Sequence, residues 1–428
     1  MRVIQSSDPG VEKVLVKQIA DQAAIEARVT EIVEQVRTEG DRAVFRLTNR
    51  FDRASITKRN FRVSNREIKE AWSKVDHEFL EVLETAIANI EEFHQKQKQH
   101  SWMEPDPYGS ILGQVVRPLK RVGIYVPGGT AAYPSTVLMN ALPAQVAGVP
   151  EIVMVSPPAA DGSLNPYTLV AADACGVREI YKVGGAQAVA ALAFGTQSLP
   201  RVDKITGPGN IYVTLAKKQV YGSVDIDMLA GPSEVLVVAD ESAPPSYIAA
   251  DLLSQAEHDA LASSILLTPS ARLAEAVKKE VERQLAQLSR REISQQSISD
   301  YGAIIITRDL EEAVALANQF APEHLELMVD QPFTWLGQIE NAGAIFIGPF
   351  SPEPIGDYIA GPNHILPTGG TARFYSPVTV DTFMKKSSVI AYSPRGFDAV
   401  ADAVIKLADV EGLGAHANSI KVRRIRPV

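Results

Sequence analysis

The seven histidines of this 428-residue chain fall into two groups with different sequence neighbours. Three lie in polar N-terminal segments, where a solvated surface side chain is the ordinary interpretation: His77, His94 and His100. The other four stand beside carboxylates, glycine or proline near the expected end of an element: His258, His324, His364 and His416. Imidazole and carboxylate groups are the usual acids, bases and metal ligands of enzymes. The second group therefore predicts a catalytic or metal-binding centre.

The segment 251–259 continues an apolar-periodic helix and carries the first of these histidines. Gln255 and His258 are three residues apart and share a helix face, and Asp251 lies four residues before Gln255 on the same side. A solvated helix face explains this pattern as well as a metal site does. The spacing leaves either Asp251 or Gln255 as a possible ligand.

Glu323 and His324 stand directly before an apolar segment that we expect to be a strand. Adjacent residues at such a position point in different directions, so the pair could serve two different proton transfers. A helix end with a hydrogen-bonded histidine is the simpler alternative.

The segment 348–364 contains four prolines and three glycines, which we expect to exclude regular structure. A long, rigid loop with large apolar groups is usually functional. It carries Asp357 and His364. Near the end of the chain, Glu411 and His416 flank a further glycine-rich turn.

Composition limits the kind of protein. A net charge of −9 and a pI near 5.4 argue against a nucleic-acid-binding protein. No apolar run approaches the roughly 18–20 residues that cross a bilayer, and residues 1–8 lack a signal-peptide core, so we expect a cytoplasmic protein. Cys175 is the only cysteine and we expect it at the end of a buried helix. Any metal must therefore be held by imidazole, carboxylate or amide groups.

Short apolar strands alternate with helical segments through most of the chain. The expected strands are 122–126, 151–155, 179–183, 202–206, 234–238, 264–267, 303–307, 325–329 and 344–347, and the terminal helical segments are 11–50, 66–99 and 397–410. This alternation predicts an α/β protein with two Rossmann-like doubly wound domains, incomplete and duplicated, plus small helical N-terminal and C-terminal elements. Ligands of such sheets collect beyond the carboxyl ends of the strands.

One segment formally matches a dinucleotide fingerprint, but its context argues against that function. Residues 412–417 fit G-x-G-x-x-A, yet a helical pattern precedes them and only eleven residues follow. Two glycine turns that follow strands and open helices, 184–187 and 207–210, are better candidates for binding phosphate.

Several motifs together resemble the histidinol dehydrogenase family. They are Ile226–Glu234 followed by Asp251–His258, the Pro-Glu-His that ends at His324, the Gly-Pro-Asn-His that ends at His364, Glu411–His416, and Arg121–Gly129. The resemblance extends from about residue 30 to the C-terminus. It implies zinc- and NAD-dependent oxidation of L-histidinol through the aldehyde to L-histidine, the last steps of histidine biosynthesis.

The resemblance also implies a role for each residue. One zinc ion per subunit would be held by Gln255, His258, Asp357 and His416, which favours the glutamine over Asp251. His324 would be the general base and Glu323 would activate water in the second oxidation. The same zinc ligands and His324 would also contact the substrate, together with Ser233, His364 and Glu411. NAD would contact Tyr125, Gln187 and Asn210.

In this family the C-terminal segment reaches the neighbouring subunit, so we expect a homodimer with shared active sites. The expected organisation is a small N-terminal element (1–25), a discontinuous zinc and substrate domain (26–119 and 232–375), an NAD domain (120–231) and a C-terminal element (376–428). Two alternatives remain. One is a related zinc and NAD dehydrogenase for another small alcohol, such as a sulfonated one, and the other is a zinc hydrolase.

Overall fold

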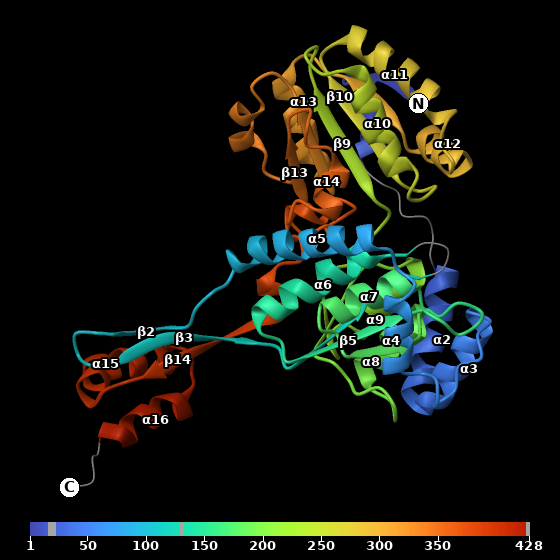
Figure 1. The fold of residues 1–428 in the computed structure, drawn as a ribbon. Helices are drawn as coiled ribbons and strands as arrows, with labels where there is room; N and C mark the ends of the chain where they lie inside the picture. Colours follow the sequence, from blue (N-terminus) through green and yellow to red (C-terminus); the bar gives the residue numbers. More distant parts are fainter. Residues whose placement is uncertain (16–22, 129–131, 425–428) are drawn as a thin grey trace. The chain divides into compact units, whose positions relative to one another are not determined.

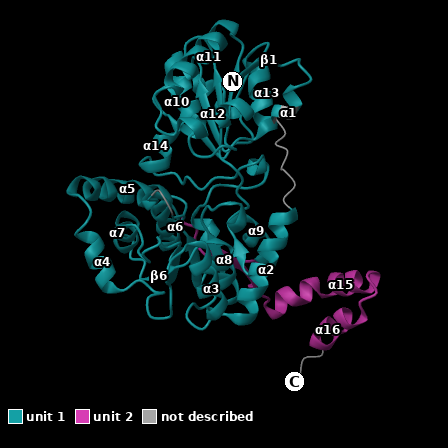
Figure 2. Ribbon diagram, turned by 90° about the vertical axis from the view of Figure 1, so that its right-hand side faces the viewer, with its two compact units in different colours: residues 1–97, 119–383 teal, residues 98–118, 384–428 magenta. Residues whose placement is uncertain are grey.

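The computed structural model describes residues 1–15, 23–128 and 132–424 (Figure 1). The chain forms two compact units, coloured separately in Figure 2. Unit 1 comprises residues 1–97 and 119–383, and unit 2 comprises residues 98–118 and 384–428. In the part of the chain that the structure describes, no helix is long and apolar enough to cross a membrane.

A five-stranded parallel sheet forms one part of unit 1. Its strands are β4 (Arg121–Tyr125), β5 (Glu151–Ser156), β6 (Glu179–Lys182), β7 (Lys204–Thr206) and β8 (Asp225–Ile226), in the order β6-β5-β4-β7-β8. The helices between successive strands are α6 (Pro134–Ala147), α7 (Pro166–Ala174), α8 (Gly185–Phe194) and α9 (Ile211–Val220). Numbered along the chain, the strand order is 3-2-1-4-5, which is the order of a doubly wound sheet.

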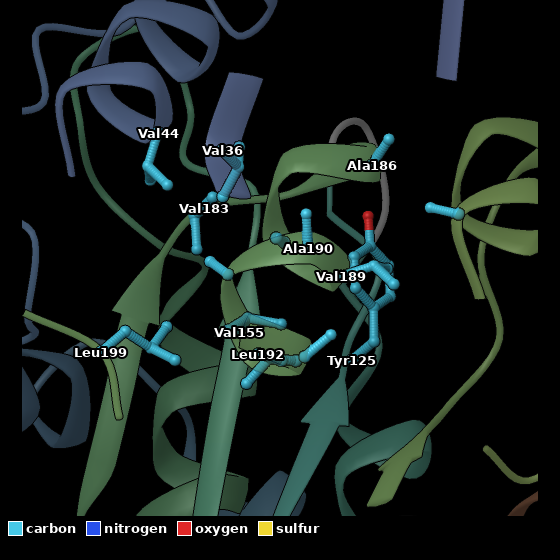
Figure 3. Packing of buried hydrophobic residues seen from close by; sticks show 14 of the residues in the cluster. Val36, Val44, Tyr125, Val155, Val183, Ala186, Val189, Ala190, Leu192 and Leu199 are labelled. Atoms are coloured by element: carbon cyan, nitrogen blue, oxygen red, sulfur yellow. The ribbon is translucent and has the colours of Figure 1, made fainter. Parts of the chain in front are cut away.

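The N-terminal helices pack against the helices that cover this sheet. They are α2 (Ala23–Glu39), α3 (Asp41–Phe51), α4 (Asn65–Trp72) and α5 (His77–Gln95). Figure 3 shows Val36 of α2 and Val44 of α3 in one buried cluster with Val155 and Val189. This differs from the expected organisation, which placed residues 26–119 with the other sheet. The amphipathic pattern of these helices requires an apolar partner but cannot say which sheet provides it.

A six-stranded parallel sheet forms the other part of unit 1. Its strands are β1 (Arg2–Gln5), β9 (Glu234–Ala239), β10 (Ser263–Thr268), β11 (Ala303–Ile306), β12 (His324–Met328) and β13 (Ala344–Ile347), in the order β1-β11-β10-β9-β12-β13. Its helices are α1 (Val11–Leu15), α10 (Pro245–Ala256), α11 (Ala271–Leu285), α12 (Arg291–Asp300), α13 (Leu310–Phe320) and α14 (Glu353–Tyr358). Strands β9 to β13 again follow the order 3-2-1-4-5, and β1 extends the edge beside β11. The predicted α/β class is confirmed.

Two features of the strand and helix pattern were not expected. Residues 2–5 pair with β11 as an edge strand, although we expected only a small separate element there. Helix α14 lies inside the segment that we expected to exclude regular structure, so that expectation was wrong. Pro352 is its N-cap and Pro354 lies in its first turn, where no backbone N–H is needed for the helix.

Unit 2 contains a three-stranded antiparallel sheet and two helices. The strands β2 (Trp102–Pro105), β3 (Ile111–Pro118) and β14 (Met384–Ala391) have the order β14-β3-β2. The helices are α15 (Pro394–Val410), which agrees with the expected helical segment 397–410, and α16 (Gly414–Arg424), which contains His416 where we expected a glycine-rich turn. Residues 98–118 thus pair with a C-terminal strand, whereas we expected them in the zinc and substrate domain. The remaining elements are short 3-10 helices at Pro332–Thr334, Leu336–Gln338, Thr371–Arg373 and Val380–Phe383.

Candidate active site

The candidate site lies at the amino ends of β9 and β12, which are neighbouring strands of the six-stranded sheet. Glu234 is the first residue of β9 and His324 is the first residue of β12. Helix α10 connects β9 to β10 and therefore ends at the same edge of the sheet (Figure 1). We expected the chemistry at the carboxyl ends of the strands, and for this sheet that expectation was wrong.

The end of α10 brings two expected ligands to this edge. Gln255 is fully buried, and neither its amide oxygen nor its amide nitrogen has a hydrogen-bond partner among the residues that the structure describes. His258 is exposed in the turn after the helix, where its backbone N–H donates to the Gln255 carbonyl at 3.2 Å. A buried amide without partners costs free energy unless a ligand completes it. Gln255 therefore fits a site that takes an ion or a polar group.

His324 is buried and held in one orientation. Its Nδ1 lies 2.9 Å from the Glu234 carbonyl oxygen, which can only accept, so Nδ1 carries the proton when the ring is neutral. Within the described part of the chain its Nε2 has no hydrogen-bond partner, and it lies 3.9 Å from Asp357 Oδ1. Burial lowers the pKa of His324. The charge of Glu353 and the hydrogen bond to the Glu234 backbone oppose this shift, whereas nearby His258 adds to it. A neutral imidazole with a free Nε2 lone pair can act as a base.

Glu323 is also buried, directly beside His324. Its carboxylate oxygen Oε2 accepts the backbone N–H of Glu234 at 2.8 Å and lies 3.6 Å from His324 Nδ1. Burial raises the pKa of Glu323 well above its ordinary value, and neighbouring negative charges on Glu234, Asp357 and Glu353 raise it further. The carboxylate form is therefore a stronger base than a solvated glutamate would be.

Helix α14 contributes two carboxyl groups one turn apart. Glu353 is buried, and Asp357 follows four residues later on the same face. Burial raises the pKa of Asp357 to about 9, with a further contribution from the charge and hydrogen bond of Glu353. The Asp357 carbonyl oxygen lies 3.0 Å from His364 Nδ1, and burial lowers the pKa of His364 to about 4.

Sequence reasoning missed the buried acids Glu326 and Glu353, and it considered Asp251 only as an alternative metal ligand. Asp251 of α10 and Glu326 of β12 are hydrogen-bonded side chain to side chain, and the backbone N–H of Glu353 donates to Glu326 Oε1 at 3.2 Å. Ser254 donates to Glu353 Oε2 at 3.1 Å. Burial raises the pKa of Asp251 to about 7 and that of Glu326 well above its ordinary range. Among the described residues, Asp251 thus has a side-chain partner in Glu326, whereas the Gln255 amide has none.

The site has the ligand atoms of a cation site, and its acidic groups lack a positively charged partner among the described residues. His324, Glu353 and Asp357 each offer a ligand atom, and these atoms lie within 4.8 Å of one another. Within residues 1–15, 23–128 and 132–424, no lysine or arginine forms an ion pair with Asp251, Glu326, Glu353 or Asp357. Several buried carboxyl groups without a cationic partner repel one another. Nitrogen and oxygen donors of this kind suit a divalent metal such as zinc.

The expected NAD residues gather at the carboxyl edge of the five-stranded sheet. Tyr125 ends β4, is buried, and its hydroxyl accepts the backbone N–H of Gly185 at 3.0 Å. Gln187 is buried in the first turn of α8. Asn210 is the N-cap of α9 and its side-chain oxygen accepts from the N–H groups of Tyr212 and Val213. Both predicted phosphate turns therefore open helices, as anion sites require.

The remaining expected site residues are Ser233, Glu411 and His416. Ser233 is half-buried directly before β9. Glu411 is the C-cap of α15 and His416 lies in α16, both exposed in unit 2. A helix precedes residues 412–417, which agrees with the rejection of the dinucleotide fingerprint. Gly129, the last residue of an expected family motif, lies outside the described residues.

The single cysteine and the three N-terminal histidines differ in burial. Cys175 is buried at the C-cap of α7, and burial raises the pKa of its thiol to about 12, so it is no nucleophile. His77 and His100 are exposed, but His94 is fully buried on the inner face of α5, which corrects the surface interpretation. Its Nδ1 lies 2.7 Å from Gln97 Oε1. Its polar neighbours in the chain occupy the other faces of the helix.

The fold and the site define an α/β enzyme with a buried acid–base pair beside a candidate metal centre. The model of the family "Histidinol dehydrogenase" matches residues 15–424. A histidinol dehydrogenase of Heliobacterium mobile is 59% identical over 423 residues, 99% of both chains. One of Clostridium acetobutylicum is 53% identical over 427 residues, again 99% of both chains.

The solved structures agree with the sequence comparisons. The crystal structure of histidinol dehydrogenase from Elizabethkingia anophelis matches with a TM-score of 0.94 and 39% identity, covering 99% of this chain and 98% of that one. An acetylating aldehyde dehydrogenase from Geobacillus thermoglucosidasius has a TM-score of 0.50 at 17% identity, covering 90% and 96%, and shares the fold alone. The chain belongs to the histidinol dehydrogenase family and is an oxidoreductase.

Proposed function

We propose that this protein oxidises L-histidinol to L-histidine through L-histidinaldehyde, with two NAD per substrate and one zinc ion per subunit, as the last steps of histidine biosynthesis. Family membership supports the substrate. The observation that carries the chemistry is the buried pair Glu323 and His324 with the half-buried Asp357 beside it, together with the unpartnered amide of Gln255 on the adjoining helix end.

The proposed zinc ligands are Gln255, His258, Asp357 and His416. The unpartnered Gln255 amide and the uncompensated Asp357 carboxylate support two of these positions. His416 would come from the partner subunit. A bound zinc ion would act as a Lewis acid that polarises the substrate oxygen. Ser233, His364 and Glu411 would contact the imidazole or amino end of the substrate, and Tyr125, Gln187 and Asn210 would contact NAD.

Two protein groups would move the protons. In the first oxidation, His324 Nε2 takes the hydroxyl proton while the alcohol carbon loses a hydride to NAD. Glu323 then removes a proton from water as its oxygen adds to the aldehyde carbon. His324 releases its first proton to solvent. In the second oxidation, the hydrated aldehyde loses a hydride to a second NAD and a proton to the again neutral His324, which gives the acid. One water is consumed and two NADH are formed.

We also infer a cytoplasmic homodimer. Exposed apolar side chains in unit 2 support association, because Ile390, Leu407 and Val410 are 69%, 65% and 70% exposed. A second copy of the chain would cover such a surface and provide His416 and Glu411. The cytoplasm is proposed because the reaction consumes the cell's internal pool of NAD. No nucleic acid or membrane is part of the proposal.

The test is to incubate purified protein with histidinol and NAD and to count NADH per histidinol consumed. We expect two equivalents, with activity lost in a chelator and restored by zinc. One equivalent with accumulating aldehyde would contradict the role of Glu323. Turnover of other small alcohols but not histidinol would favour the related alcohol dehydrogenase, and hydrolysis without NADH would favour a zinc hydrolase.

A further inference from the structure

Glu234 contacts both members of the Glu323–His324 pair. It is 1% exposed at the start of β9, in the centre of the six-stranded sheet. Its backbone N–H donates to Glu323 Oε2 at 2.8 Å, and its carbonyl oxygen accepts from His324 Nδ1 at 2.9 Å. Both contacts use the backbone, which any residue at this position would provide.

The side chain of Glu234 adds two contacts that only an acceptor of this length can make. Its Oε2 accepts the backbone N–H of Glu323 at 3.3 Å, and its Oε1 accepts the backbone N–H of Gly369 at 3.1 Å. Glu234 and Glu323 thus each accept the other's peptide N–H. The carboxylate also ties the beginning of β12 to the loop that follows His364. A buried carboxyl group is tolerated only with such partners.

The two contact types act on different residues. His324 is oriented by the carbonyl of Glu234, so its orientation does not depend on the side chain at position 234. Glu323 is held from both ends, at its carboxylate by the backbone of Glu234 and at its peptide N–H by the side chain. Loss of the side-chain acceptor would therefore free Glu323 before it affects His324.

We propose that Glu234 is a positioning residue that holds Glu323 for the water-dependent second oxidation. The proposal rests on the proposed function, in which Glu323 activates water and His324 acts in both oxidations. It predicts that a change at position 234 slows oxidation of the aldehyde selectively. A residue with a merely structural role would affect both oxidations alike.

The test uses Glu234→Gln, which keeps the size but offers one acceptor oxygen for two N–H donors. We expect oxidation of supplied histidinaldehyde to fall about tenfold or more, the loss expected for one displaced charge-assisted hydrogen bond. Single-turnover oxidation of histidinol should fall less than about threefold, and NADH per histidinol should drop from two toward one. Glu241→Gln, an exposed glutamate beyond the other end of β9, is the matched control and should change neither step.

A double-mutant cycle separates positioning from general disturbance. In a Glu323→Gln background, Glu234→Gln should cause no further loss in the aldehyde step, because the two residues act together. Equal losses in both backgrounds, or equal slowing of both oxidations, would overturn the proposal. A Glu323→Gln variant that keeps the full aldehyde step would instead refute the proposed role of Glu323.

Glu234→Asp is a second variant if the glutamine variant does not fold. It keeps the charge, but it is one methylene shorter and cannot reach both N–H groups. We expect the same selective loss of the aldehyde step, with a melting temperature close to that of the parent. If neither variant folds while Glu241→Gln does, Glu234 has a structural role and the proposal is wrong.

Discussion

The raised pKa of Asp357, a proposed zinc ligand, predicts that this side chain destabilises the folded state of the metal-free protein. The pKa of this carboxyl is raised to about 9, against an ordinary value near 3.8. Because the folded pKa is the higher one, the folded state favours the protonated form. The destabilising effect of the ionised Asp357 carboxylate on the folded state is absent below about pH 4, grows as pH rises toward 9, and is complete above that value.

The size of this effect follows from the shift. Each pH unit between the two pKa values costs about 1.4 kcal/mol, which gives an upper limit of about 4 kcal/mol at pH 7. The side chain is 17% exposed, so water and relaxation reduce this, and we expect about 2–4 kcal/mol. Asp357→Asn removes the charge and keeps the shape. The metal-free variant should therefore be more stable than the metal-free parent, by a margin that grows with pH.

Urea unfolding of both proteins in a chelator at several pH values between 5 and 8 measures this margin. Asp330→Asn, an exposed aspartate after β12, is the control and should stay within about 0.5 kcal/mol of the parent. Zinc at about 1,000 times its Kd should reverse the order, since it adds about 4.1 kcal/mol to the parent alone, more than the expected margin. A less stable metal-free Asp357→Asn variant, or a margin that does not vary with pH, would refute the reasoning.

Three other predictions concern separate parts of the molecule. Cys175→Ala should keep full activity and lose about 1 kcal/mol of unfolding free energy; an activity loss above tenfold would return the thiol to the mechanism. Gly207→Ala should cost about 3 kcal/mol or more in thermal unfolding and weaken NAD binding, because Gly207 has φ +112° and a Cβ would meet the Tyr125 carbonyl. When inactive Asp357→Asn and His416→Ala dimers are mixed and allowed to exchange subunits, about a quarter of parental activity should return, since half of the dimers would contain one intact site. No recovery in the exchanged dimers would count against shared sites.

The regular parts of the fold could be predicted because their pattern is local. Apolar runs that alternate with helical segments placed nine strands of the two parallel sheets to within a few residues. The pattern failed where partners are distant. Residues 2–5 and 111–118 form strands only because β11 and β14 lie beside them. Helix packing is equally non-local, which is why the buried side of α5, with His94, could not be identified from its polar neighbours.

The site was predicted in part for a similar reason. Glu323, His324 and Asp357 stand in unusual sequence contexts, and the resemblance assigned them roles. Glu326 gave no such signal, because His-Leu-Glu-Leu has the alternation of a strand with one face in water. Yet β12 lies between β9 and β13 in a sheet covered by helices, so both of its faces are buried. An acid inside a strand of a parallel sheet is therefore itself a signal of a partnered, functional group.

The position of the site at the amino edge of β9 and β12 has a chemical consequence. Peptide N–H groups at this edge donate to carboxylates: Glu234 to Glu323, Glu323 to Glu234, and Glu353 to Glu326. Such donors keep the acids in place without neutralising them, because a peptide dipole offsets only part of a full charge. The edge thus concentrates basic carboxylates around one neutral imidazole. A water-dependent oxidation needs that combination. One group must activate water, while another receives the hydroxyl proton that is lost in each oxidation.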